Sequence, residues 1–195
     1  MRTWREWFPR VLIESALVVF GILLALAADG WWESRKERRM AQQALDSFIR
    51  EIRMNRESLR RIMPYHAELY SQFQALSDAG SVRTFDDLRK IEGFHGFRPA
   101  FLTDTAWRTA LATGALTHME YETVARLSAL YTAQQRFVEM SQPDFIKGPG
   151  AWTEANIGSI VRSAAIYLAD VTAGEEEMLV FYNTTLNTLG AGDDP

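Results

Sequence analysis

The hydrophobic and polar positions divide the chain into one unbroken apolar run and a long remainder with helical periodicity. The run extends from Val11 to Ala28 and contains Glu14 as its single charged side chain. As a helix it would be about 27 Å long, close to the hydrocarbon thickness of a bilayer. No other stretch is long and apolar enough to cross a membrane. We therefore predict that residues 1–32 form an N-terminal tail and a single transmembrane anchor.

Aromatic and basic residues flank the run, as expected at membrane–water interfaces. We predict that the interfacial side chains are Trp4, Trp7, Arg10, Trp31, Trp32, Arg35 and Lys36. A small-x-small pattern, Ala25-Leu26-Ala27, leaves a cleaved signal peptide as the alternative to a retained anchor. Lys and Arg are almost equally numerous near the two ends, so the flanking charge does not set the orientation. We expect a single-pass protein of a bacterial inner membrane with a periplasmic C-terminal domain.

Three side chains within the run are candidates for contact with a partner helix. Glu14 is an intramembrane carboxylate, which either contacts a partner or reaches the interface, where Arg10 can pair with it. Gly21 and Ala25 form a small-xxx-small face that allows another helix to approach closely.

Residues 33–63 carry a seven-residue repeat of mainly apolar positions and are predicted to form one amphipathic stalk helix. The repeat consists of Ala41, Leu45, Phe48, Ile52, Asn55, Leu59 and Ile62. This stripe either packs on later helices of the chain or pairs with a second copy as a coiled coil, in which Asn55 would fix the register. Pro64 is then expected to interrupt or kink the helix.

Residues 64–190 are predicted to form a helical bundle packed with the stalk, followed by a loose tail over residues 191–195. A capping box of Thr84 and Asp87 opens a short helix, and Thr103 and Asp104 are expected to cap the next one. Two C-terminal helices are expected, the second capped by Thr172 with Glu175. No segment alternates convincingly between apolar and polar residues at period two, so the predicted fold class is all-α.

The sequence offers no catalytic or cofactor motif. The absence of cysteine excludes disulfides, thiol catalysis and thiolate metal sites. His66, His95 and His118 share no metal-binding spacing, and we interpret them as surface or capping residues. Residues 175–177 are three glutamates that we interpret as a charged helix N-terminus. We expect no enzyme activity, cofactor or metal, and a net charge of −4 gives little support for nucleic-acid binding.

An irregular loop over residues 92–102 is rich in aromatic side chains. Its candidates for contact with a partner are Phe94, His95, Phe97 and Phe101. Loops carry binding residues more often than regular elements do. The alternative is that these aromatic rings fold back onto the core.

Several segments resemble a family of uncharacterised single-span bacterial inner-membrane proteins. They are Glu14, VVFGILLAL from Val18 to Leu26, the Trp31/Trp32 pair at the exit, and EIRMNRESL from Glu51 to Leu59. TAWRTALATGAL, from Thr105 to Leu116, is similar to the short middle helix and turn of that group. The resemblance implies an anchor with a helical domain and carries over no catalytic residue.

These observations lead to two functional hypotheses. The first is a non-enzymatic accessory or scaffold subunit that binds a larger inner-membrane complex, such as a respiratory or photosynthetic one. Its partners would be the bilayer and other membrane subunits, with a homo-oligomer through the stalk as a further option. The alternative is a membrane-tethered, ligand-binding sensor domain with a pocket near His95 and Trp107.

Overall fold

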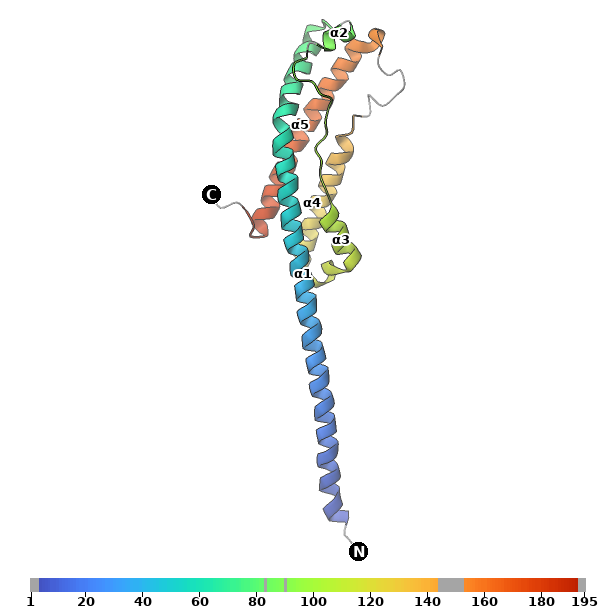
Figure 1. Cartoon of the computed structure of the whole chain (residues 1–195), viewed down its shortest axis with the longest axis vertical. Coiled ribbons are helices and arrows are strands. Elements are labelled where there is room, and N and C mark those ends of the chain that lie inside the picture. Colours follow the sequence, from blue (N-terminus) through green and yellow to red (C-terminus); the bar gives the residue numbers. More distant parts are fainter. Residues whose placement is uncertain (1–3, 83, 90, 144–152, 193–195) are drawn as a thin grey trace.

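A computed structural model describes residues 4–82, 84–89, 91–143 and 153–192, with side chains described from Glu14 onward. Within these ranges every regular element is a helix, so the predicted all-α class is confirmed (Figure 1). The elements are α1 (Trp4–Ala79), α2 (Phe85–Leu88), α3 (Thr105–Thr113), the 3₁₀ turn η1 (Ala115–His118), α4 (Tyr121–Met140), the 3₁₀ turn η3 (Glu154–Asn156) and α5 (Ile157–Thr188). The side chains of Trp4, Trp7 and Arg10, and tail residues 193–195, lie outside the described part.

Helix α1 is the axis of the molecule. Its 76 residues correspond to a length of about 110 Å. The N-terminal part stands apart from the other helices, and the C-terminal part packs against α5, which runs in the opposite direction (Figure 1). Helix α4 covers α5, and α3 with η1 packs on α1 at the end of the domain nearest the free part of α1.

Pro64 does not interrupt α1, so the first of its two predicted effects, an interruption of the helix, is wrong. Proline lacks the N–H that would donate to the carbonyl of residue 60. Pro64 and Arg60 are both exposed, so water can satisfy this carbonyl. Leu59 and His66, on either side of the proline, are buried in the same domain, which favours the continuous helix. The predicted stalk and the first helix of the predicted bundle are therefore one element.

Two hydrophobic cores lie along α1. The core nearer the free end holds Phe48, Ile52 and Leu59 of the stripe, all with no exposed surface, against side chains of α4 and α5. The stripe therefore packs within the chain, and these positions are covered. The second core joins Leu69 and Phe73 of α1 to the loop after α2 and to the first half of α5.

Helix α5 is continuous through the position where a second helix was expected to begin. The Thr172 hydroxyl donates to the Leu168 carbonyl oxygen at 2.9 Å, as in a helix interior, and caps no new helix. Glu175 is fully buried in the middle of α5, so its assignment to a charged N-terminus is also wrong. The capping box of Thr84 with Asp87 is confirmed at the start of α2.

Candidate functional site

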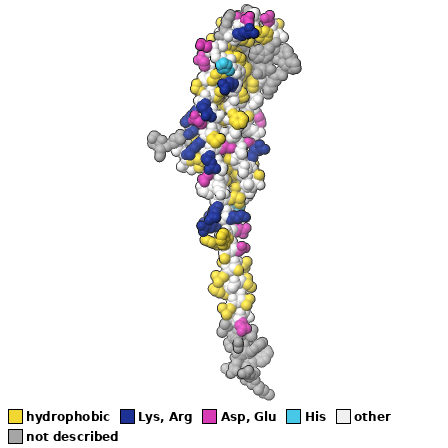
Figure 2. All heavy atoms as spheres, viewed as in Figure 1, with side chains coloured by type: hydrophobic (Ala, Val, Ile, Leu, Met, Phe, Trp, Pro, Cys, Tyr) yellow, Lys and Arg dark blue, Asp and Glu magenta, His cyan; other side chains and the backbone are white. Residues whose placement is uncertain are grey.

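The apolar segment of α1 is exposed along its described length. From Glu14 to Gly30 every side chain or glycine position is exposed, and the segment is long and apolar enough to cross a membrane. Basic side chains gather where the domain begins, directly beyond this segment (Figure 2). Trp31 and Trp32 are exposed with ring centroids 6.2 Å apart, and the Arg35 guanidinium lies 5.4 Å from the Trp31 ring. The structure thus places exposed aromatic and basic side chains directly beyond the apolar segment, and their contact with a membrane interface stays a prediction.

One face of α1 extends from the apolar segment to the domain. Because the helix is unbroken, residues about 18 apart are separated by about five turns and share a face. Gln43 is thus five turns beyond Ala25, and Arg50 is ten turns beyond Glu14. Gly21 lies one turn before Ala25. The three predicted contact residues of the span therefore share a face with Gln43 and Arg50, which we call the contact face.

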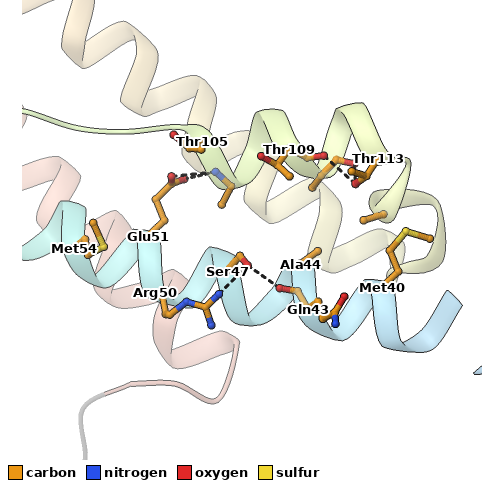
Figure 3. Close-up of a pocket in the computed structure, with 13 residues that line it drawn as sticks. Met40, Gln43, Ala44, Ser47, Arg50, Glu51, Met54, Thr105, Thr109 and Thr113 are labelled. Carbon is orange, nitrogen blue, oxygen red and sulfur yellow. Dashed lines mark hydrogen bonds between the residues drawn. The ribbon is translucent and has the colours of Figure 1, made fainter. Parts of the chain in front are cut away.

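The contact face leads into a groove between α1 and α3 with a volume of about 510 Å³ (Figure 3). The α1 wall consists of Met40, Gln43, Ala44, Ser47, Arg50, Glu51 and Met54. The opposite wall carries only threonine and alanine side chains, at Thr105, Ala106, Thr109, Ala110, Thr113 and Ala115. These small side chains leave room for a further helix to approach both walls.

Glu51 fixes the start of α3 against α1 and so builds the groove. Its carboxylate accepts the Ala106 N–H at 3.0 and 3.1 Å and the Tyr131 hydroxyl at 2.7 Å. Asp104, which was expected to cap α3, makes no side-chain capping bond within the described structure. A carboxylate from α1 takes that place, because unpaired N–H groups and the helix dipole favour a negative charge there.

Asn55 continues this network one turn along α1. Its amide nitrogen donates to the Thr103 carbonyl at 2.7 Å, and its oxygen accepts the Thr103 N–H at 3.0 Å. Gln134 donates to the same carbonyl at 2.9 Å and accepts the Tyr182 hydroxyl at 2.6 Å. Burial and the Glu51 charge raise the pKa of Tyr131 and Tyr182 far above the ordinary value, so both hydroxyls stay protonated donors. Asn55 also donates to Gln134 Oε1 at 3.0 Å, so Asn55 and Gln134 together join α1, the segment before α3, α4 and α5.

The domain segments that carry the family resemblance meet at this point. Glu51 and Asn55 belong to the first of them, and Ala106 belongs to the second, residues 105–116. The hydrogen bonds of Glu51 thus connect two motifs that are about 50 residues apart in the sequence. The periodicity predicts a register role for Asn55, whereas the sequence names Glu51 only as part of the resembling segment and predicts no contact for it.

A second buried polar pair lies higher in the domain. His66 and Glu175 are both fully buried, and His66 Nδ1 lies 2.6 Å from Glu175 Oε1. His66 Nε2 lies 2.8 Å from the Phe97 carbonyl oxygen and 3.2 Å from that of Arg98. Burial alone would lower the pKa of His66, but the Glu175 hydrogen bond and charge, with both carbonyls, raise it above 6.5.

Both ring nitrogens of His66 therefore face acceptors, as an imidazolium requires. The interpretation of His66 as a surface or capping residue is wrong, because the ring joins α1, the aromatic loop and α5. Neither side chain of the pair reaches the surface, so the pair holds the fold together and contacts no substrate. Among the described residues, no group of three or more acidic, histidine or cysteine side chains could hold a metal ion.

The aromatic loop divides into packed and exposed positions. Phe97 is buried and Phe94 is half-buried, with ring centroids 5.5 Å apart in the second core. His95 is exposed and Phe101 is 81 % exposed. The side chains of Phe94 and Phe97 are therefore used in packing, and His95 and Phe101 are the loop candidates that a partner can reach.

The hollow nearest Trp107 has a volume of about 370 Å³ and lies between α3 and α4. Trp107 and Tyr131 both line this hollow, and their rings stack with centroids 5.6 Å apart. His95 does not line this hollow. The two residues expected to share a ligand pocket are thus not joined by it.

No model of a known family, no curated protein and no solved structure matches this chain. The resemblance of this chain to the single-span bacterial family stays a prediction.

Proposed function

We propose that this protein is a non-enzymatic, membrane-anchored accessory subunit that stabilises a larger protein complex of a bacterial inner membrane. Its apolar segment would cross the bilayer once, and its helical domain would stand on the periplasmic surface. The observation that supports this most directly is the continuity of α1. One helix carries both the fully exposed apolar segment and the side chains at the centre of the domain core.

The apolar segment needs an apolar environment. Eight large side chains between Leu17 and Leu26 are 55–65 % exposed, namely Leu17, Val18, Val19, Phe20, Ile22, Leu23, Leu24 and Leu26. A contiguous exposed patch of this kind is typical of a surface that contacts lipid or another protein. A helix satisfies its own backbone hydrogen bonds, so it can occupy the bilayer without further partners.

The buried polar groups support a structural role. Glu51 borders the groove, but its oxygens already accept hydrogen bonds from α3 and α4. His66 and Glu175 are enclosed by the helices that they connect. These three ionisable groups are thus occupied in positioning helices.

The test is purification of the full chain from native membranes in mild detergent, with native-gel sizing of wild type and Glu14→Gln. We expect the wild type to migrate within a complex much larger than the chain. The Glu14→Gln variant should lose part of that association, since a carboxylate within a span contributes to helix contacts. Glu176→Gln, an exposed position on α5, is the matched control and should behave as wild type.

Two results would contradict the proposal. Migration of the wild type alone, as a monomer or a small homo-oligomer, would refute the accessory role and favour the ligand-binding alternative, whose hollow beside Trp107 would then be screened. Unchanged assembly and abundance of Glu14→Gln would refute the contact role of Glu14.

A further inference from the structure

The contact face is a single surface about 54 Å long, because the 36 residues from Glu14 to Arg50 make about ten turns. Its chemistry changes along this length. The carboxylate of Glu14 is followed by the small residues Gly21 and Ala25, with no described atom within 4 Å of a Cβ built on Gly21. Beyond the exit the same spacing places Trp32, Arg39 and Arg50 on the face, and Asp29 and Lys36 lie at its edge.

The side chains that line the groove at the domain end of this face are of the kinds found in helix-binding grooves. Two parallel walls are provided by α1 and α3, and the α3 wall is made of small side chains. Met40 and Met54 lie at the two ends of the α1 wall, and Met54 is 64 % exposed. Methionine side chains adapt to different partners, and an amphipathic helix in a groove is a common recognition mode.

The direction of the groove connects it to the span. A straight helix lying on Gln43 and Ser47 and extended toward the free end of α1 meets the apolar segment at Ala25 and Gly21. These are the positions at which a neighbouring helix can approach most closely. One partner helix can therefore occupy the groove and the span together, provided that it leaves the bilayer on the same side as the domain.

The charges on the contact face argue against a second copy of this chain as the occupant. Two copies in one membrane would be related by an axis along the bilayer normal, so that each residue of the face meets its own equivalent. Arg39 and Arg50 would each face an identical charge, which destabilises an interface. The face therefore fits a chain of complementary charge.

We infer that the contact face binds one transmembrane helix of another protein, which continues out of the bilayer alongside α1 and fills the α1–α3 groove. This helix carries small or apolar residues against Gly21 and Ala25, leaves room for the Trp32 ring, and carries carboxylates facing Arg39 and Arg50. The inference rests on the proposed accessory function and names the kind of partner.

The test is site-specific photo-crosslinking in native membranes, with benzophenone-phenylalanine placed in the full chain. Ala25 and Gln43 are the positions on the contact face. Ala27 and Gln42 are controls of the same residue types, turned away from these positions by about 200° and 100°. Ala25 and Gln43 should give an adduct with the same heterologous protein, mapped by mass spectrometry to a membrane-spanning helix and its acidic extension, and both controls should lose it.

A charge reversal adds a second readout. Arg50→Glu should lose the Gln43 adduct, because it would repel the partner's carboxylates. Arg60→Glu, an exposed position of α1 outside the groove, should keep it.

Several outcomes would overturn the inference. An adduct of two copies of this chain would show a homodimer, and an adduct from Gln43 without Ala25 would show a helix that does not enter the membrane. Equal adducts from face and control positions, or none from the face, would show that no helix lies there. Co-migration with a large complex in the absence of the Gln43 adduct would refute this inference and leave the accessory function standing.

Discussion

Removal of one partner of the His66–Glu175 pair should destabilise the domain strongly. His66→Leu would leave the Glu175 carboxylate in the core, where Oε1 loses its donor and Oε2 already has no hydrogen bond within the described structure. Breaking a buried pair in this way costs about 3–5 kcal/mol. For a domain of roughly 160 residues, at about 2–4 °C per kcal/mol, we expect the melting temperature to fall by roughly 6–20 °C.

Removal of both charges should recover part of this loss. In the double variant His66→Leu with Glu175→Met, no charge remains in the core, and such replacements are often close to neutral. The remaining cost is that of the Phe97 carbonyl, which loses its donor, about 1–3 kcal/mol. The double variant should therefore be more stable than His66→Leu alone.

The same pair gives a pH dependence with a definite sign. The folded-state pKa of His66 is raised above its ordinary 6.5, because Glu175 and the carbonyls of Phe97 and Arg98 outweigh the effect of burial. A group of this kind contributes its full stabilisation below the unfolded pKa and loses it as the pH rises through the folded pKa. The melting temperature of the wild type should therefore fall as the pH rises above 6.5. The double variant should not show this fall, because it has no His66 to lose a proton.

The assay is thermal unfolding of the full chain in mild detergent, followed by far-UV circular dichroism on both sides of pH 6.5. Glu176→Met, exposed and adjacent to Glu175, serves as the control and should melt with the wild type. The reasoning would be refuted if His66→Leu melted as the wild type does. It would also be refuted if the double variant lost the sum of the two single losses, because the residues would then act independently.

Two further substitutions test the packing of α3 and of α5. Glu51→Ala should lower the free energy of unfolding by about 1–3 kcal/mol for each donor left without an acceptor, including the Tyr131 hydroxyl. Amide hydrogen exchange should become faster in α3 in particular. An equal increase in exchange throughout the chain would contradict the role given to Glu51. Gly174→Ala should lower the free energy of unfolding by about 1–3 kcal/mol in a thermal melt, because its Cβ would lie 2.9 Å from Cδ2 of the buried Phe137 ring. A Cβ built on Gly158 has no described atom within 4 Å, so Gly158→Ala should be neutral or stabilising by up to ~1 kcal/mol. An equal loss of stability in both glycine variants would exclude a steric cause.

The features that the sequence predicts correctly are local. The periodicity over a few helix turns predicts a stripe that includes Phe48 and Leu59. The burial of both residues in one core confirms that this stripe faces the interior. The capping box of Thr84 with Asp87 is likewise contained within four residues. Such features depend on neighbours within a helix turn, which the sequence specifies directly.

The polar contacts that organise the domain join residues far apart in the chain, and the interpretation of single residues misses them. His66 and Glu175 are 109 residues apart. A signal is nevertheless present, because the stripe of α1 continues past Pro64 through His66 to Leu69 at the same alternating spacing. Glu175 lies on the corresponding stripe of α5. The assumption of a break at Pro64 and at Thr172 placed both residues at helix ends, where a charged side chain is expected to be solvated.

The contact face itself could not be derived from the sequence, because it requires α1 to be continuous. Each residue of the face was assessed within a short segment, and Gly21 and Gln43 were assigned to separate elements. Only an unbroken helix fixes the rotation between them.

The continuity of α1 also makes the protein a mechanical lever. The part of α1 from Asp29 to Ala79 would extend about 75 Å from the bilayer surface. If the span tilts by a further 10°, as a helix does when bilayer thickness changes, the far end of α1 moves sideways by roughly 13 Å. The second core and the aromatic loop, which lie near that end, would move with it (Figure 1). A small adjustment between lipid and protein would thus become a displacement comparable to the width of a helix.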